Sequence, residues 1–229
     1  METEEQEYDD EGVSEARWVI EHAGVKLKVA ATVETCECYV NVTGTIQCGD
    51  VQVGTLEATK LLFSDALESG HSLLNLFDTS GETEECAKLF DDFSEFLKDR
   101  YAILLNCPVV DNVALINHIQ IYPEHRGHGY GLLTMRCLLN DLADSDSLVV
   151  CKPFPLNVGR DGHPVDVRDE DQDIAARKQE QHKLQRYWRR AGFRRMSGTE
   201  LYALNRENEL PTVEEMLKRP ARKTTTAKV

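Results

Sequence analysis

Apolar and polar positions alternate along residues 15–63, the first part of the chain with a regular pattern. Three stretches rich in β-branched residues occur there, WVIEHAGVKLKVAATVET, CYVNVTGTIQ and VQVGTLEATKLLF. Period-two alternation is typical of strands with one buried face, and the polar break CGD is typical of a turn. The pattern therefore predicts an antiparallel meander.

After residue 63 the apolar spacing becomes helical. FSDALESGHSLLNLF and SGETEECAKLFDDFSEFLKDRY carry apolar residues about 3.6 positions apart, which predicts two helices. Aromatic residues at this spacing ordinarily face a core, so we interpret them as core rather than as ligand contacts. The stripe expected on the second helix is Leu89, Phe90, Phe93, Phe96 and Leu97.

Residues 112–151 follow the order strand, turn, helix, strand. NVALINHIQIY is apolar enough for a central strand, and Pro123 ends it because proline has no N–H for a sheet ladder. LLTMRCLLNDLADS then has leucine and methionine at helical spacing, and SLVVC is typical of a buried parallel strand. We therefore expect a right-handed βαβ crossover.

The rest of the chain predicts a long loop, two helices and one strand. Residues 156–172 are polar and rich in Gly, Pro and Asp, which is typical of a loop. A helix is expected over about 173–190, closed by Gly192, and one last strand within RRMSGTELYALN. Thr212 and Glu215 form a capping box for a short helix, TVEEMLKR.

These elements predict one domain of mixed α+β class over residues 15–206. Before it lies an acidic segment, 1–14, which we expect to be a disordered tail. After it, residues 207–229 combine the short helix with a basic tail, which we expect to be flexible.

Charge limits the classes of partner. The 229 residues carry 26 Lys+Arg against 40 Asp+Glu, a formal net charge of −14 at pH 7. This charge disfavours nucleic acid, which needs a basic surface, and favours cationic partners such as amines or basic peptides. No apolar run is long enough to span a membrane, and METEEQEYDDEG lacks the order of a secretory signal. The seven cysteines include no CxxC pair, so we expect reduced thiols, no metal site and a cytoplasmic protein.

The turn HRGHGYGLL has glycine at every second position from 127 to 131. It does not fit G-x-G-x-x-G, because Leu132 stands where the third glycine is needed, and no Walker lysine follows Gly131. A helix N-terminus still presents unpaired N–H groups and the positive end of the helix dipole, so phosphate is the favoured ligand. A glycine turn used only for packing in a structural protein is the alternative.

IQIYPEHRGHGYG resembles the acetyl-CoA signature of the GNAT superfamily of N-acetyltransferases, an apolar strand with L-x-V-x-P-x-x-R-G-x-G-x-G/A before a helix. LQRYWRRAGFRRM is similar to a later segment of that family, an aromatic pair before x-x-x-G-F. The likeness covers about residues 15–206 in outline, with sharp motif matches only at 115–136 and 184–196. The matched positions of the signature are Ile119, Ile121, Pro123, Arg126, Gly127, Gly129 and Gly131.

The resemblance implies the GNAT fold, a central, mostly antiparallel sheet with a coenzyme A-binding βαβ unit flanked by helices. It implies that acetyl-CoA lies between splayed strands at 113–121 and 147–153. The acetyl group then passes through a tetrahedral intermediate to a primary amine of a cationic small molecule or protein, and coenzyme A is the product. The main chain of Ile121 is expected to contact the pantetheine arm. The cofactor residues are then Ile119, Ile121, Arg126, Gly127, His128, Gly129, Tyr130 and Gly131.

The general base is the first point at which the chain departs from the family. On the family model it often lies an even number of residues before Ile121, where this chain has only Ile119, Asn117 and Leu115. His118 is the candidate base, although strict alternation places it on the other face unless a bulge re-phases the strand. The alternatives beside the turn are Glu124 and His125.

The general acid is the second departure. The family's tyrosine corresponds to Trp188, and Tyr187, one residue earlier, is the candidate acid. One residue rotates a helical side chain by about 100°, so Tyr187 in the core and Trp188 beside the thioester is the alternative. Cys137 and Cys151 are interpreted as small core residues. These departures keep open a second function, a non-catalytic acyl-CoA-binding sensor or scaffold, and a homodimer is also open.

Overall fold

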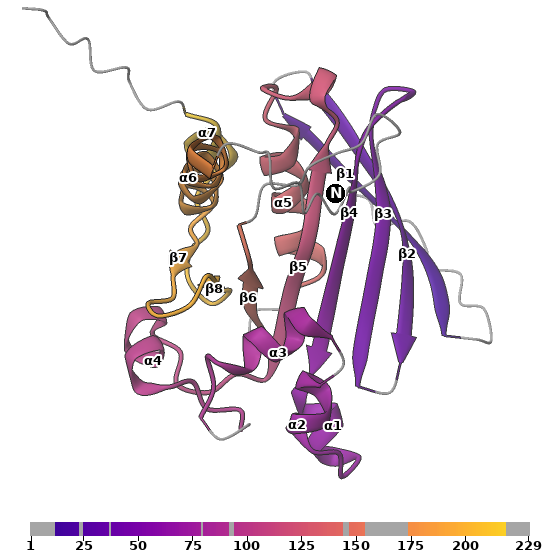
Figure 1. The fold of residues 1–229 in the computed structure, drawn as a ribbon. Coiled ribbons are helices and arrows are strands. Elements are labelled where there is room, and N and C mark those ends of the chain that lie inside the picture. Colours follow the sequence, from indigo (N-terminus) through magenta and orange to yellow (C-terminus); the bar gives the residue numbers. More distant parts are fainter. Residues whose placement is uncertain are drawn as a thin grey trace, which may run out of the picture.

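An eight-stranded sheet, in the order β1-β2-β3-β4-β5-β6-β8-β7, forms the centre of the protein (Figure 1). All neighbouring strands in it are antiparallel except β5 and β6. The mixed α+β class with a mostly antiparallel sheet is therefore confirmed. The structure is a computed structural model, and it describes residues 12–22, 25–36, 38–78, 80–91, 94–143, 147–153 and 174–218.

The predicted meander is confirmed as four long strands. Along β2 the alternation is regular, with Leu27, Val29 and Ala31 buried between exposed neighbours, because one face of the strand meets the core. Residues 13 and 14, predicted as part of a disordered tail, already belong to the sheet. The four strands are β1 (Val13–His22), β2 (Val25–Cys36), β3 (Tyr39–Cys48) and β4 (Val51–Leu62).

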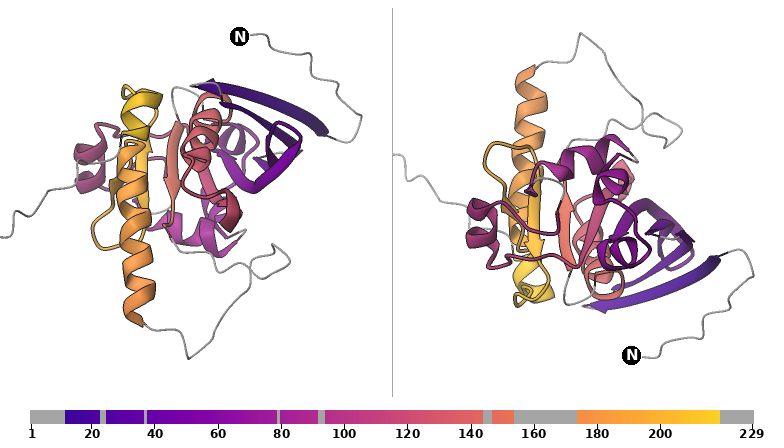
Figure 2. Two further views of the ribbon diagram at one scale, coloured as in Figure 1. Left: turned by 90° about the horizontal axis from the view of Figure 1, so that it is seen from above. Right: turned by 90° about the horizontal axis from the view of Figure 1, so that it is seen from below.

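The predicted βαβ unit is also present. Strand β5 (Asn112–Ile121) leads through the glycine turn into helix α5 (Tyr130–Asp141), and β6 (Ser147–Cys151) returns parallel to β5. Strands β1 and β2 curl towards the helix, so α5 lies against both β1 and β5 (Figure 2). One face of the sheet is thereby closed over α5.

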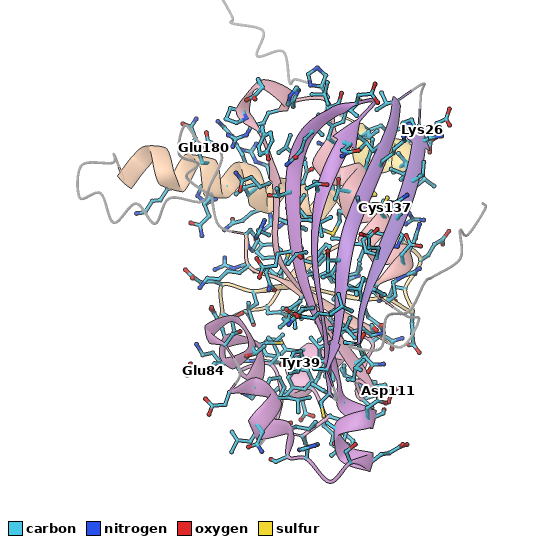
Figure 3. The ribbon with its side chains drawn as sticks, turned by 90° about the vertical axis from the view of Figure 1, so that its right-hand side faces the viewer. Lys26, Tyr39, Glu84, Asp111, Cys137 and Glu180 are labelled. Carbon is cyan, nitrogen blue, oxygen red and sulfur yellow. The ribbon has the colours of Figure 1, made fainter. Side chains whose placement is uncertain are left out.

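Helices cover the two faces of the sheet unequally. On the α5 face, α6 (Ile174–Arg190) and α7 (Val213–Leu217) extend the cover over the later strands. The opposite face is covered only at its lower end, and Figure 3 shows these helices below the long strands. The upper part of that face carries no helix of the described residues. The helices below are α1 (Phe63–Glu68), α2 (Leu73–Phe77), α3 (Gly81–Ala87) and α4 (Asp99–Leu105).

The single helix predicted over SGETEECAKLFDDFSEFLKDRY is wrong. Helix α3 stops at Ala87, and the chain then folds back so that Phe90 and Leu97 form a β-bridge. The Asp91 N–H donates to the Phe96 carbonyl, which replaces helical bonding, and Phe96 is 49% exposed rather than part of a buried stripe. Leu89, Phe90 and Leu97 are buried as expected, and Phe93 lies outside the described residues.

The C-terminal elements agree with the prediction except for the last strand. The expected single strand is a hairpin of two short ones, β7 (Arg194–Arg195) and β8 (Tyr202–Asn205), because a turn with a left-handed Gly198 interrupts it. Gly192 has the positive φ of a helix C-cap, and the capping box of Thr212 and Glu215 is present.

Three of the predicted segments lie wholly or mostly outside the described residues. They are the loop at 156–172, residues 1–11 of the acidic tail and residues 219–229 of the basic tail. Among the described residues, no helix is long and apolar enough to cross a membrane, and no cluster of metal-ligating side chains occurs.

Candidate functional site

The central strand β5 changes character at Ile116. From Asn112 to Ile116 it pairs with β4 on one side and with β6 on the other. Beyond Ile116, which faces Cys151 at the end of β6, its pairing continues only with β4 in the described part of the chain. The last five residues of β5, 117–121, therefore leave one backbone edge open in the middle of the sheet.

A β-bulge marks the same place. Ala58 pairs with Ile116 and Glu57 with His118, so Asn117 is the extra residue of β5. Past the bulge Ile119 and Ile121 face the α5 side, where they pack against its core. The bulge thus takes up Asn117 and leaves His118 on the face opposite the two isoleucines.

The glycine turn runs from a short 3-10 helix, Pro123–His125, into α5. Gly127 and Gly129 have φ of +87° and +83°, a left-handed conformation that glycine adopts without strain. The backbone amides of the five residues 127–131 donate to no acceptor among the described residues. They precede or begin a helix of 12 residues, so they combine unpaired donors with the positive end of the helix dipole.

The polar side chains of the turn bind back to it. Arg126 donates from Nε to the Ile121 carbonyl at 3.0 Å, and His128 Nδ1 lies 3.2 Å from the His125 carbonyl. The His128 ring stacks on Tyr130 with centroids 5.3 Å apart. Arg126 therefore braces the turn against the end of β5, while the amides of residues 127–131 have no acceptor among the described residues.

Tyr187 joins three elements of the candidate cofactor site. The space that a Cβ on Gly131 would need is filled by the Tyr187 hydroxyl and, beyond it, by the Ile121 side chain. Burial raises the pKa of Tyr187 well above its usual value, which keeps the hydroxyl protonated at neutral pH as a proton donor requires. Trp188 is 9% exposed and packs edge-on against Phe193, so it belongs to the core.

Helix α7 covers part of the turn, which sequence reasoning did not anticipate. The Cδ2 of Leu217 lies 2.5 Å from where a Cβ on Gly129 would stand. The capping box and apolar spacing predict the helix itself, but nothing local in the sequence specifies where its apolar side docks. Glycine at position 129 is thus required by the packing of Leu217 as well as by the backbone conformation.

Cys137 and Cys151, the two cysteines of the βαβ unit, lie in the core. Both are buried, and burial raises the pKa of Cys137 to about 12 and that of Cys151 well above its usual value. A thiol at such a pKa is protonated at neutral pH and therefore unreactive. Their interpretation as core residues agrees with this burial.

On the face of the sheet opposite α5, His118 meets a carboxylate. Its Nδ1 lies 3.4 Å from Oε2 of Glu57 on β4. The Asn117 amide, turned to the same face by the bulge, donates to Oε1 of Glu57 at 3.5 Å and to the Thr59 hydroxyl at 3.2 Å. Sequence reasoning missed Glu57, because only the register between β4 and β5 brings it to His118. The alternative bases Glu124 and His125 lie instead in the 3-10 helix that precedes the turn.

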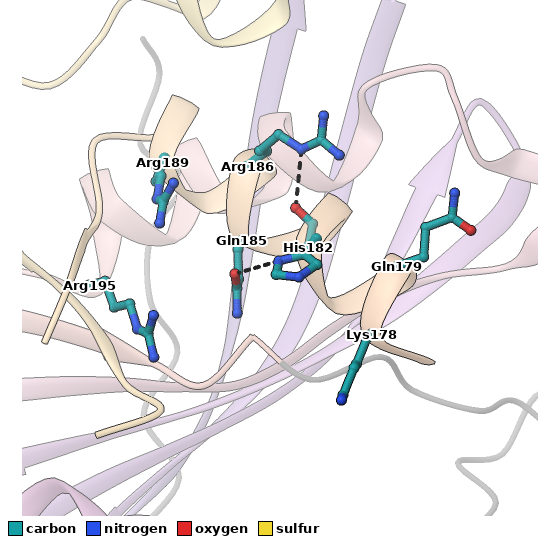
Figure 4. Close-up of a pocket in the computed structure, with 7 residues that line it drawn as sticks. All are labelled: Lys178, Gln179, His182, Gln185, Arg186, Arg189 and Arg195. Carbon is teal, nitrogen blue, oxygen red and sulfur yellow. Dashed lines mark hydrogen bonds between the residues drawn. The ribbon is translucent and has the colours of Figure 1, made fainter. Parts of the chain in front are cut away.

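A hollow lies away from these groups, on the outer side of α6 beside β7 (Figure 4). Lys178, Arg186 and Arg189 lie on one face of the helix, and Arg195 comes from β7. Arg186 Nε donates to the His182 carbonyl. It contains none of the predicted site residues. The lining residues are Lys178, Gln179, His182, Gln185, Arg186, Arg189 and Arg195.

The geometry thus divides the predicted residues between two faces. Ile119, Ile121, Tyr187 and the turn lie on the α5 side, and His118 lies on the other side of the same strand half. A ligand held in the open edge beside residues 117–121 would be reached from both faces. No known family model, curated protein or solved structure matches the chain.

Proposed function

We propose that the protein is an acetyl-CoA-dependent N-acetyltransferase of GNAT fold, acting on a primary amine of a cationic acceptor. One observation carries the proposal: among the residues that the structure describes, five consecutive amides at 127–131 have no acceptor, and they lie shortly after the half of β5 that has no second strand partner. A pyrophosphate needs the first feature and an extended amide-bearing arm needs the second. The signature residues supply both at the spacing of the family that they resemble.

The chemistry follows from what lies on each side of the open edge. A thioester there has the Tyr187 hydroxyl on the α5 side and the His118 imidazole on the other. An amine attacking from the His118 side loses its proton to a base, and the departing sulfur takes a proton from the acid side. A backbone N–H on this edge of β5, which has no strand partner beyond Ile116 among the described residues, would face the developing oxyanion.

A non-catalytic acyl-CoA-binding module is the second candidate. Trp188, at the position of the family's tyrosine, is buried against Phe193, and Tyr187 has its hydroxyl packed on the backbone of Gly131. Both side chains then serve packing, and the turn would still bind coenzyme A. The two functions differ only in whether thiol is released.

The test of cofactor binding uses a pair of glycines that share a backbone conformation. Gly127 and Gly70 have φ of +87° and +75°, and a Cβ on either would meet nothing within 4 Å. Valine is strained at both positions, but only Gly127 lies in the turn. We expect acetyl-CoA to raise the melting temperature of the original chain and of G70V, and to bind G127V at least tenfold more weakly.

Release of thiol then distinguishes the transferase from the binding module. The original chain is mixed with acetyl-CoA and spermidine, kanamycin or a lysine-containing peptide, and free coenzyme A thiol is measured. Release with any of them supports the transferase, and stabilisation without release supports the binding module. Acetyl-CoA at millimolar concentration that stabilises neither the original chain nor G70V would refute both.

A further inference from the structure

The upper part of the sheet face opposite α5 is hollowed into an open groove. Its volume is about 1030 Å³, and strands β1 to β5 form its floor. Four threonines belong to the lining, Thr32, Thr43, Thr45 and Thr55. Gln52 also lines the groove, and its amide donates to the Tyr122 hydroxyl at 2.6 Å. The floor therefore carries polar side chains together with apolar ones such as Ala30 and Leu56.

Glu57 and His118 lie together at the β5 side of this groove. The His118 side chain is 20% exposed and that of Glu57 is 47% exposed, so the pair is reached from the groove. Contact of Nδ1 with the carboxylate favours a proton on Nδ1, which leaves the lone pair on Nε2. The Asn117 amide donates to the other carboxylate oxygen, Oε1, at 3.5 Å.

The electrostatic balance at His118 is set mainly by burial. Burial lowers the pKa of His118, and the Glu57 carboxylate opposes this by raising it. The other charged or titratable groups of the groove are Glu15 and Arg17 on β1, which pair with each other at 3.5 Å, and Tyr122 after β5. Glu57 is the group that acts on the ring directly.

We propose that this groove receives the acceptor amine and that Glu57 is the positioning residue of His118, the general base. The proposal rests on the proposed transferase function. It joins three independent features: the groove, the Nδ1–carboxylate contact, and the position of His118 beside the open edge of β5. Glu57 holds the ring and its tautomer, and His118 Nε2 accepts the proton.

The proton and electron balance is complete without a further reactant. The acceptor ammonium gives one proton to Nε2 of His118, and the freed nitrogen lone pair forms the C–N bond with the thioester carbon. The C–S bond breaks, the sulfur leaves with its electron pair, and it is protonated as the new amide nitrogen loses its second proton. The proton on His118 returns to water. The products are the acetylated amine, coenzyme A and one proton.

The experiment compares E57Q with E15Q, which removes the other carboxylate of the groove from the far strand β1. NMR titration of the His118 ring, assigned with H118Q, gives its pKa in each protein. Removing the Glu57 charge takes away the interaction that raises this pKa, so we expect a lower value in E57Q and no change in E15Q. An unchanged His118 pKa in E57Q would overturn the pairing.

The kinetic part follows thiol release from acetyl-CoA with spermidine, kanamycin and a lysine-containing peptide across pH. A base must be neutral, so kcat/KM rises with pH through the pKa of His118. In E57Q the rise of kcat/KM should move to lower pH. In H118Q the value of kcat/KM at high pH should fall by about 10²-fold or more. A purely structural role of Glu57 would lower activity without moving the profile, and that result would overturn the proposal.

Cofactor binding separates this inference from the function on which it rests. The acetyl-CoA affinity of E57Q and H118Q should equal that of the original chain, because both side chains lie on the groove face. If E57Q binds acetyl-CoA normally and its pH profile of kcat/KM is unchanged, the inference about Glu57 is refuted and the transferase function is not. Binding without thiol release from any of the three amines also refutes it and supports the binding module. Absence of binding in the original chain refutes the transferase itself.

Discussion

The two halves of β5 differ although they belong to one strand. From Val113 to Ile116 every residue is buried and the backbone is paired on both sides. From Asn117 to Ile121 only Gln120 is buried, a bulge interrupts the ladder, and one backbone edge has no strand beside it in the described structure. Backbone donors and acceptors inside a fold need partners, so the second half is suited to pair with a ligand. The first half specifies the fold, and the second half carries the candidate chemistry.

The largest expected effect comes from two single-residue deletions in β5, one of the bulge residue Asn117 and one of Gln120 beyond it. Deleting Gln120 turns Ile121 from the α5 core to the groove face, since a one-residue slip reverses the facing of a strand. Deleting Asn117 leaves a regular ladder with the pairs Glu57–His118 and Leu56–Ile119 unchanged. We expect loss of cooperative folding in the first variant and a cost of about 1–3 kcal/mol in the second, from two lost hydrogen bonds.

Urea unfolding followed by circular dichroism measures both deletions. Equal damage by the two would show that the bulge is required for the fold, and the division of β5 into two halves would then fail.

A matched pair of truncations gives the next largest effect. Ile116 and Ile119 face the same core from opposite sides of the bulge, but Ile116 is 5% exposed and Ile119 is only half-buried. I116A should lower the free energy of unfolding by about 2–5 kcal/mol, as for buried isoleucine elsewhere, and I119A by less than half of that. Chemical denaturation at constant m-value provides the comparison, and a larger cost for I119A would contradict it.

The smallest effect concerns the contact between Gly131 and Tyr187. An alanine at 131 meets the Tyr187 hydroxyl, while its better helix propensity offsets part of the strain. G131A should therefore cost about 1 kcal/mol, and Y187F should recover most of it in the double variant. A double-mutant cycle on unfolding free energies measures the coupling. Additive effects would place the tyrosine hydroxyl away from the first turn of α5.

Regular periodicity predicted most of the elements. The alternation in β2 and the apolar run of β5 specify strands whatever their neighbours are, and both were predicted. The prediction failed for the segment around Asp91 and Phe96. Its apolar spacing suits a helix, but the backbone folds back into a β-bridge. The local apolar pattern cannot distinguish a helix from a folded-back segment where tertiary packing decides between them.

The candidate site was predicted only where it is local. The turn at 127–131 is one continuous segment, so its glycine spacing was visible in the sequence. Glu57 depends on how β4 registers with β5, and Leu217 depends on where α7 docks. Both relations join residues that are far apart in the chain, and no pattern within either segment encodes them.

The contact between Leu217 and Gly129 changes what the glycine motif indicates about a ligand. Gly129 is required twice, by its backbone angle and by the leucine that fills the space above it. Retention of glycine at this position among variants of the chain would therefore be expected even if no ligand ever bound. Gly127 has open space around it and only its backbone angle to account for it. Gly127 is thus more informative about a ligand than Gly129. Tolerance of other residues at position 127 would be the strongest evidence against a bound ligand.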